Sequence, residues 1–307
     1  MVDFLAVIGP TAAGKTRAAV ETAFRIDGEI ISADSRQVYQ GLDIGSGKDL
    51  QEYSVRGKDI PYHLIDISPV EEEYNLFQFQ RDFLRAYHEI KRKDRTPILC
   101  GGTGLYIEAV VKGYNLVPTP ENKSLREELE GKSDGELVAM LSSYKKLHNK
   151  TDIEDRSRLI RALEIAVYEK AHPEHKFPNL STIVFGLKFE RNALKSRITE
   201  RLRIRLENGM IDEVQSLLDR GVSKERLFKL GLEYRYVSMY LTKELNYNDM
   251  YQKLNSAIHA FAKRQMTWFR KMERDGICIH WIDAAQPVEA IAGEIVERYN
   301  DLSANSR

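Results

Sequence analysis

Short apolar runs alternate along the chain with longer segments in which apolar residues recur every three or four positions. The runs predict buried strands at residues 4–8, within 29–39, at 62–67, within 96–106, at 181–188 and at 277–282. Strands that alternate with helices predict an α/β fold with a parallel sheet. One helical stripe, within 71–95, is typical of core packing rather than chemistry and consists of Leu76, Phe79, Phe83, Tyr87 and Ile90.

The pattern changes between residues 115 and 180, where polar helical segments replace the strands. Pro118 and Pro120 break the chain, and helices are expected at 125–130, 137–141 and 155–164. We therefore divide the chain into three parts: the first part of an α/β core at 1–114, an inserted helical subdomain at 115–180, and the second part of the core, with basic helices, at 181–307.

Composition adds few constraints to this picture. The 46 basic and 46 acidic residues give no net charge, so bulk charge neither supports nor excludes a nucleic-acid partner. The two cysteines, Cys100 and Cys278, exclude a disulfide framework and a cysteine-based zinc cluster. No signal peptide is recognisable and no apolar run approaches the ~20 residues of a membrane span, so a cytoplasmic protein with no membrane partner is expected.

A glycine-bounded segment follows the first predicted strand and precedes a helical one. Residues 9–16 read Gly-Pro-Thr-Ala-Ala-Gly-Lys-Thr, the spacing of a phosphate-binding loop whose backbone N–H groups and helix dipole face an anion. Gly9 and Gly14 would allow close approach of the backbone. Lys15 would bring a positive charge to the phosphates, and Thr16 a hydroxyl ligand for Mg²⁺. A chance glycine-rich turn is the weaker interpretation.

Polar residues follow two of the predicted strands. Residues 34–37 come after one, and the Gly-Gly-Thr-Gly turn at 101–104, which contains Thr103, comes after another. Because ligands of parallel sheets collect outside the carboxyl ends of the strands, both groups are expected beside the phosphate loop. Helix capping explains Asp34 equally well, and a purely structural turn would use the same residues as 101–104.

Basic residues are concentrated in the last third of the chain. Residues 188–275 hold 19 Lys and Arg against 12 Asp and Glu, an excess of seven. Arg197, Arg201 and Arg205 recur every four residues on one helical face, for which a solvated stripe is the favoured interpretation. Between 257 and 272 basic and aromatic residues are interleaved. We expect Phe261, Trp268 and Met272 to face the core and the cations to suit phosphate-backbone contact.

Taken together, the motifs resemble those of the bacterial-type tRNA dimethylallyltransferases, which prenylate the adenosine just 3′ of the anticodon. The shared segments extend over nearly the whole chain in the family's order, which is far more specific than a phosphate loop alone. They are the loop at 9–16, Ser-Ala-Asp-Ser at 32–35 with Tyr39, Asp-Ile-Gly at 43–45, His-Leu-Ile-Asp-Ile at 63–67, Gly-Gly-Thr-Gly-Leu-Tyr at 101–106, Arg-Leu-Ile-Arg-Ala-Leu-Glu at 158–164 and Lys-Arg-Gln-Met-Thr-Trp-Phe-Arg at 263–270.

The resemblance implies a P-loop NTPase-like parallel sheet core flanked by helices, with an inserted helical subdomain that grips the anticodon stem-loop of tRNA. By position, Asp34 matches the general base that takes the proton of adenine N6, Thr103 a hydroxyl at the diphosphate, and Arg201 the arginine that clamps it. With Mg²⁺ as cofactor, the phosphate loop would bind the diphosphate of dimethylallyl diphosphate through Gly9, Thr11, Ala12, Ala13, Gly14, Lys15 and Thr16.

The same resemblance implies which residues meet the tRNA. The target adenosine must leave its stack to reach the base in the site. We expect the protein to be a monomer. The implied tRNA contacts are Asp34, Ser35, Arg36, Gln37, Arg126, Ser157, Arg158, Arg161, Arg235, Lys263, Arg264, Gln265, Trp268 and Arg270.

The chain departs from the family's pattern at four places. Residues 44–49 read Ile-Gly-Ser-Gly-Lys-Asp rather than Ile-Gly-Thr-Ala-Lys-Pro, and residues 152–155 replace a common His-Pro-Asn-Asp. Glu233 replaces a glycine, and Ala13 replaces a serine. The first three lie in segments expected to contact or position tRNA, so we expect them to bear on the RNA partner rather than on the chemistry.

Three other functions fit parts of the sequence. A small-molecule P-loop kinase would use Lys15, Thr16 and Asp34 equally well, but it leaves the basic helices unexplained. An adenylate isopentenyltransferase would share the chemistry but take a free nucleotide. An RNA-binding protein with an inactive phosphate loop conflicts with the presence of all three of these residues.

Overall fold

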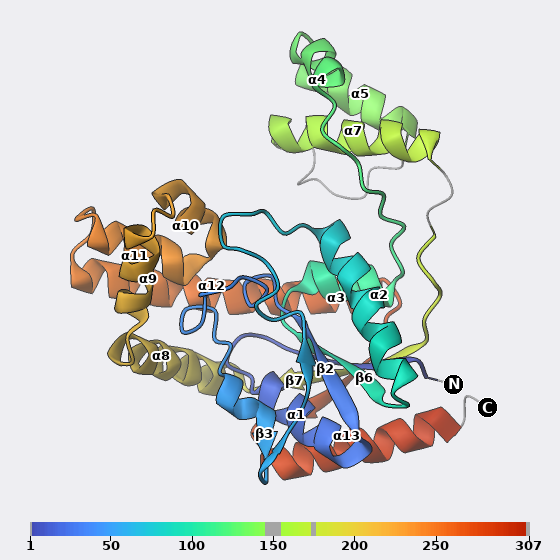
Figure 1. Ribbon diagram of the computed structural model, residues 1–307, viewed down its shortest axis with the longest axis vertical. Helices are drawn as coiled ribbons and strands as arrows, with labels where there is room; N and C mark the ends of the chain where they lie inside the picture. Colours follow the sequence, from blue (N-terminus) through green and yellow to red (C-terminus); the bar gives the residue numbers. More distant parts are fainter. Residues whose placement is uncertain (1, 145–154, 173–175, 305–307) are drawn as a thin grey trace. The chain divides into compact units, whose positions relative to one another are not determined.

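The structure is a computed structural model that describes residues 2–144, 155–172 and 176–304. It divides into two compact units, one formed by residues 1–112 and 179–307 and the other by residues 113–178 (Figure 1). The first is the α/β core. The second contains only helices and connecting segments in its described part. The boundaries expected from the sequence fell after residues 114 and 180.

The described part of the core unit is built on a six-stranded parallel sheet. β1 (Phe4–Ile8) lies inside it with every residue buried, and strands buried on both faces are continuously apolar rather than alternating. The carboxyl ends of β1 and its neighbours therefore lie at one edge. The order of the strands is β5 (Tyr62–His63), β2 (Gly28–Ala33), β6 (Thr96–Gly101), β1, β7 (Thr182–Lys188) and β8 (Ile279–Asp283).

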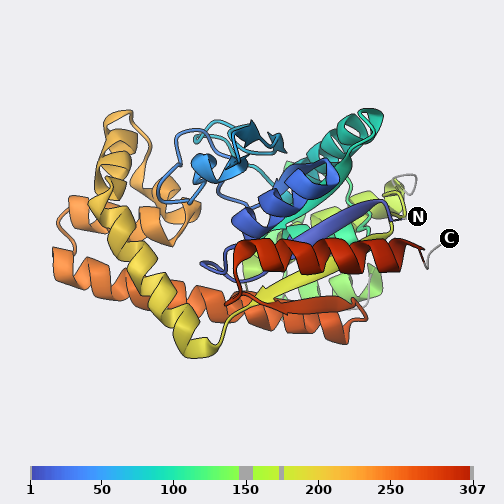
Figure 2. The ribbon, with the colours of Figure 1, turned by 90° about the horizontal axis from the view of Figure 1, so that it is seen from below.

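Helices cover both faces of the sheet (Figures 1 and 2). On one face, α1 (Lys15–Ile26) packs against α13 (Val288–Ala304) over Leu5 and Val7 of β1. On the other, α2 (Leu76–Arg92) places Phe83 edge-on against Phe4 and packs against α3 (Gly104–Val111). The stripe predicted within 71–95 is confirmed as core, because its last four members are buried in α2.

A second group of helices follows β7 and shares one apolar core. None of the helices in the described parts of the chain combines the length and the apolarity needed to cross a membrane. The group consists of α8 (Arg191–Glu207), α9 (Met210–Asp219), α10 (Lys224–Leu230), α11 (Leu232–Leu241) and α12 (Tyr247–Arg274).

The buried face of α12 differs from the sequence prediction. Phe261, expected in the core, is 38% exposed, and Trp268 is half-buried. The buried positions are instead Ala262, Gln265 and Phe269, three and four residues apart on the face that packs inward. Met272, the third residue expected in the core, is buried. Apolar residues occur on more than one face of this helix, so periodicity alone misplaced the other two.

The third predicted strand is also shorter than expected, since β5 ends at His63 rather than at residue 67. Leu64 and Asp66 have φ angles of 63° and 55°, and a left-handed backbone cannot continue an extended strand. A 3₁₀ helix, η1 (Leu50–Tyr53), and a small hairpin of β3 (Ser54–Val55) and β4 (Lys58–Asp59) precede it and were not predicted.

The second unit holds α4 (Lys123–Glu130), α5 (Asp134–Tyr144) and α7 (Arg156–Ala171). The two chain segments that bound the unit meet, because the Phe177 N–H donates a hydrogen bond to Asn115 Oδ1 at 2.9 Å. The three helices bury a small core that includes Leu129, Leu137, Leu141, Leu159 and Leu163.

Candidate active site

The predicted phosphate loop connects β1 to α1 at the carboxyl edge of the sheet. Gly14 precedes α1 with φ 80°, and α1 begins without a side-chain cap, so the N–H groups of its first turn face an open cavity. At Gly9, with φ 157°, a Cβ would lie 2.7 Å from the Leu187 carbonyl oxygen, so only glycine fits against β7. The loop therefore has the geometry of an anion cradle.

Lys15 lies at the centre of this cradle. Its Nζ donates a hydrogen bond to the Pro10 carbonyl at 2.7 Å. Burial of the ammonium group lowers the pKa of Lys15 to about 8, and the positive charge of Arg201 contributes to the decrease, while Asp34 opposes it. A lysine whose charge is this poorly solvated gains much from an anionic ligand.

The polar residues after β2 and β6 meet beside the loop, as predicted. The Ser35 N–H donates to Thr103 Oγ1 at 3.0 Å, which ties the two strand ends together. Asp34 Oδ1 accepts the Arg36 N–H at 2.9 Å, so Asp34 closes a turn and does not cap a helix, because no helix follows it. Gln37, expected at the RNA, is buried between Ser32 and the Gly47 carbonyl.

Gln265 joins the phosphate loop to the turn at 101–104. Its Oε1 accepts the Thr11 N–H and its Nε2 donates to the Gly102 carbonyl, both at 2.8 Å. The side chain is buried, so the contact with RNA expected for Gln265 is not what the structure shows; both ends of its amide are used inside the protein. One helical turn later, Trp268 lies so close to Gly104 that a Cβ there would come within 2.5 Å of the indole.

The arginine row on α8 lies along the phosphate loop, although Arg197 at its start is exposed to solvent. Arg197 Nε donates to the Ala12 carbonyl at 3.0 Å, and Arg201 Nη2 donates to Asp49 Oδ2 at 2.7 Å. Arg205 is only 12% exposed. The solvated-stripe interpretation is therefore wrong for Arg201 and Arg205, because the helix packs this part of its basic face onto the loop. A cavity of about 490 Å³ lies between them, lined by Lys15, Thr16, Asp49 and Arg201 among others.

The glycine-punctuated loop at 41–48 is held from two sides. The Glu213 carboxylate of α9 accepts the N–H groups of Asp43, Ile44 and Gly45 at 2.6–3.1 Å. Lys48, 1% exposed, donates to the Tyr39 carbonyl and to two aspartates. These anchors were not predicted, since nothing local in the sequence links residue 213 to residue 44.

In the second unit, the four residues expected to contact tRNA fall into two groups. Arg126 and Arg161 both donate to the buried carboxylate of Glu164, at 2.8–2.9 Å. Burial alone would raise the pKa of Glu164, but these hydrogen bonds lower it to about 2. Ser157 and Arg158 are exposed. The departure at residues 152–154 lies outside the described residues.

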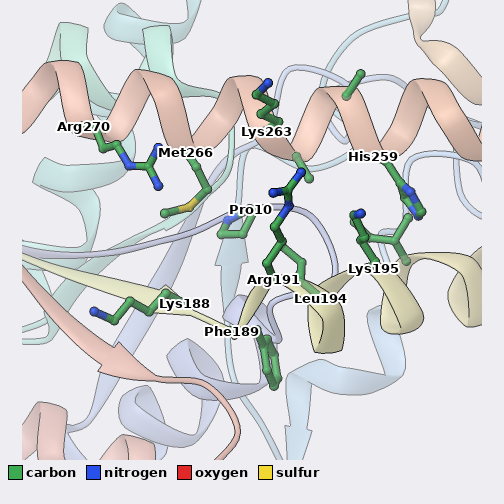
Figure 3. Close-up of a pocket in the computed structure, with 13 residues that line it drawn as sticks. Pro10, Lys188, Phe189, Arg191, Leu194, Lys195, His259, Lys263, Met266 and Arg270 are labelled. Atoms are coloured by element: carbon green, nitrogen blue, oxygen red, sulfur yellow. The ribbon is translucent and has the colours of Figure 1, made fainter.

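A second cavity of about 470 Å³ lies between α8, α12 and Pro10 of the phosphate loop (Figure 3). In Figure 3, Arg191 rises from α8 toward α12, and Arg270 points from α12 toward the cavity. None of its five basic residues takes part in an ion pair within the described residues, and no acidic residue lines it. Three of them were not predicted as contacts. We call this set the cation pocket: Lys188, Arg191, Lys195, Lys263 and Arg270.

The remaining predicted contacts lie on exposed cation–aromatic pairs. Arg235 stacks on Phe228 and Arg264 on Phe261, at 5.2 and 5.9 Å from the ring centres.

For a metal, no cluster of three or more His, Cys, Asp or Glu ligands occurs in the described chain. The Thr16 hydroxyl in the cavity fits Mg²⁺ nonetheless, because this ion takes few protein ligands and completes its shell with water and phosphate oxygens.

Known proteins resemble the chain over nearly its full length. Residues 37–272 match the family described as IPP transferase, and residues 2–59 the one described as isopentenyl transferase. tRNA dimethylallyltransferase 2 of Phocaeicola vulgatus is 50% identical over 96% of both chains, and tRNA dimethylallyltransferase 2 of Porphyromonas gingivalis is 52% identical over 96% of this chain and 98% of its own. The chain belongs to the tRNA dimethylallyltransferase family.

A solved structure of this family supports the fold. The full-length tRNA isopentenylpyrophosphate transferase of Bacillus halodurans is 31% identical, with a TM-score of 0.71 over 99% of this chain and 98% of its own. The core is thus P-loop NTPase-like, as expected. Membership in the tRNA dimethylallyltransferase family favours prenyl transfer over the kinase and the non-enzymatic RNA-binding interpretations.

Two of the chain's departures from the tRNA dimethylallyltransferase pattern lie close together in the structure. Gly47 and Asp49 lie against Arg201 and Arg205, and Glu233 lines the same small cavity as these two arginines. We expected these departures to bear on the RNA partner. The structure places them beside the phosphate loop.

Proposed function

We propose that the protein transfers a dimethylallyl group from dimethylallyl diphosphate to N6 of the adenosine 3′-adjacent to the anticodon, position 37, and releases diphosphate. The observation that carries this proposal is the meeting of an anion cradle and a carboxylate at one sheet edge. Lys15 and the first turn of α1 form the cradle, and Asp34 and Thr103 end the neighbouring strands beside it.

The reaction forms a bond from the adenine N6 to C1 of the dimethylallyl group while the C1–O bond to the diphosphate breaks. The leaving oxygen takes the electron pair, and Lys15, Arg201 and the loop N–H groups offset its charge. Asp34 accepts the N6 proton. One of its oxygens is held by the Arg36 N–H, which restrains the carboxylate and leaves the other oxygen to take the proton.

Thr103 and Thr16 would complete the site. The Thr103 hydroxyl, already held by the Ser35 N–H, would contact the diphosphate. Thr16 would hold Mg²⁺, which neutralises phosphate charge when bound. Gly9, Thr11, Ala12, Ala13 and Gly14 would shape the loop around the diphosphate, although the Thr11 N–H already donates to Gln265.

Unpaired cations on the core support contact with the anticodon stem-loop of tRNA. The cation pocket joins Lys263 and Arg270 to three further basic residues with no acid between them, a composition suited to phosphodiester groups. Exposed Ser157 and Arg158 offer further contacts on the second unit. We propose that one chain suffices for the reaction.

The test is incubation of the purified protein with labelled dimethylallyl diphosphate, Mg²⁺ and either unmodified tRNA, AMP or ATP. Label should enter tRNA alone and map to adenosine 37. Label in AMP but not in tRNA would refute the proposal. Asp34→Asn, which keeps the turn to Arg36, should lower turnover, whereas Arg201→Ala should mainly weaken diphosphate binding. Full turnover by Asp34→Asn would remove Asp34 as the base.

A further inference from the structure

Three residues from two of the chain's departures from its family pattern converge on one pair of arginines. Arg201 and Arg205 lie one turn apart on α8, and Arg201 lines the cavity of the phosphate loop. Gly47 and Asp49 approach both arginines from the 41–49 loop, and Glu233 approaches Arg205 from α11. Such convergence indicates a shared task rather than three independent surface changes.

Asp49 is the residue that bridges the two arginines. Its Oδ2 lies 2.7 Å from Arg201 Nη2, a hydrogen-bonded ion pair, and 3.7 Å from Arg205 Nη2. The second distance is too long for a hydrogen bond, and Arg205 Nη2 is buried without any hydrogen-bond partner among the described residues. The Asp49 carboxylate therefore forms a hydrogen bond with Arg201, whereas it interacts with Arg205 only through charge.

Gly47 makes this arrangement possible. It has φ 68°, and a Cβ built there would overlap the Arg205 guanidinium and lie 2.6 Å from Arg201 Nη2. An alanine, which the family pattern has at this position, could not coexist with these arginines as they stand. This chain therefore has both the space that the Arg205 guanidinium needs and a carboxylate, that of Asp49, which interacts with both arginines.

The Asp49 carboxylate lies in the cavity where the diphosphate is expected to bind. It lines the same cavity as Lys15, Thr16 and Arg201, and Arg201 is the arginine expected to clamp the diphosphate. The Asp49 side chain is 33% exposed and belongs to a loop, just before η1. A partly exposed carboxylate of this kind can leave its partner at modest cost, because such ion pairs contribute only about 0.2–1 kcal/mol.

We propose that Asp49 is an internal counter-anion of the Arg201–Arg205 pair, which diphosphate displaces when it binds. In the free enzyme the carboxylate holds both guanidinium groups in place. Diphosphate must exchange with it, so the bound product is held less tightly than two free arginines would hold it. The inference rests on the proposed function, since it takes the cavity to be the diphosphate site.

Pyrophosphate binding measured by calorimetry tests this directly. Asp49→Asn is the informative variant, because asparagine keeps the acceptor oxygen and tolerates the left-handed backbone of Asp49, φ 41°. We expect the variant to bind pyrophosphate about two- to fivefold more tightly, with and without Mg²⁺, as the loss of a partly exposed ion pair predicts. The donor KM should fall in parallel.

Glu207→Gln is the matched control. Glu207 is on the same helix and its removal changes the charge equally, but it pairs with Arg203, not with the clamp. We expect its pyrophosphate affinity to equal that of the wild type. Equal gains in both variants would make the effect one of general charge and would overturn the proposal.

Other outcomes separate the alternatives. Unchanged binding by Asp49→Asn, or weaker binding in the absence of Mg²⁺, would show that Asp49 only positions Arg201. Weaker binding in the presence of Mg²⁺ alone would make Asp49 a metal ligand. Each of these results refutes the counter-anion role. Failure of the wild-type protein to bind pyrophosphate at all would instead refute the proposed diphosphate site, and this inference with it.

Discussion

Replacing Gln265 with leucine should separate the phosphate loop from the neighbouring glycine-rich turn. The substitution keeps the side chain's size but removes the acceptor for the Thr11 N–H and the donor to the Gly102 carbonyl, both at 2.8 Å. Gln265 is 7% exposed, so water has little access to replace either bond. Because an unsatisfied buried backbone group costs about 1–3 kcal/mol, the two together cost about 2–6 kcal/mol. The better burial of leucine offsets about 1 kcal/mol, which leaves a predicted loss of about 1–5 kcal/mol.

Urea denaturation, followed by circular dichroism, measures that loss in the free energy of unfolding. Calorimetry with pyrophosphate should show weaker binding as well, because the loop that carries Lys15 loses its link to α12. Thr267→Ala is the control on the same helix, since Thr267 is exposed and its hydroxyl bonds, among the described residues, only to the Lys263 carbonyl. A loss below about 1 kcal/mol in Gln265→Leu would refute the reasoning, because even a single unsatisfied buried backbone group costs about 1 kcal/mol or more.

Three further predictions concern charge. The pKa of Lys15, lowered by burial to about 8, means that the free enzyme carries this charge below pH 8 and loses it above; pyrophosphate affinity should therefore fall as the pH rises through 8, and Lys15→Arg should lack this step. The triple variant Lys188→Ala/Arg191→Ala/Lys195→Ala should weaken tRNA binding and reduce its salt slope by about 2–3, whereas Lys91→Ala/Arg92→Ala, at the end of α2, should change neither. In the second unit, the lowered pKa of Glu164 gives stability that is complete above pH 4.5 and lost as the pH falls toward 2; Glu164→Gln should lower the melting temperature at pH 7 and flatten its acid dependence, and an unchanged acid profile would contradict this.

The sequence predicted those parts of the fold in which each segment carries its own signal. β1, β2, β6, β7 and β8 are mostly apolar runs that end in glycine or polar residues or are followed by them, and the phosphate loop is a local motif. The neighbourhood of Asp34 and Thr103 also followed, because parallel strands place their carboxyl ends at one edge.

What the sequence could not supply are the long-range bonds of polar side chains. Gln265 reads as a surface residue of a basic helix, yet it is buried because two distant backbone groups require its amide. The row from Arg197 to Arg205 has the spacing of a solvated stripe. Only the packing of α8 in the fold shows that these arginines lie along the phosphate loop. Glu213 and the 43–45 backbone are likewise far apart in the chain and bonded only in the fold.

The bond between Asn115 and Phe177 shortens the path by which the sheet assembles. β1 pairs with β6 on one side and with β7 on the other, and residues 113–178 lie between these two partners in the chain. Once the hydrogen bond between Phe177 and Asn115 has formed, β6 and β7 are connected by a short loop rather than by the whole insertion. Less conformational entropy is then lost when β7 joins the sheet. Insertions of different length should then change the folding rate of the core little, provided that this junction is kept.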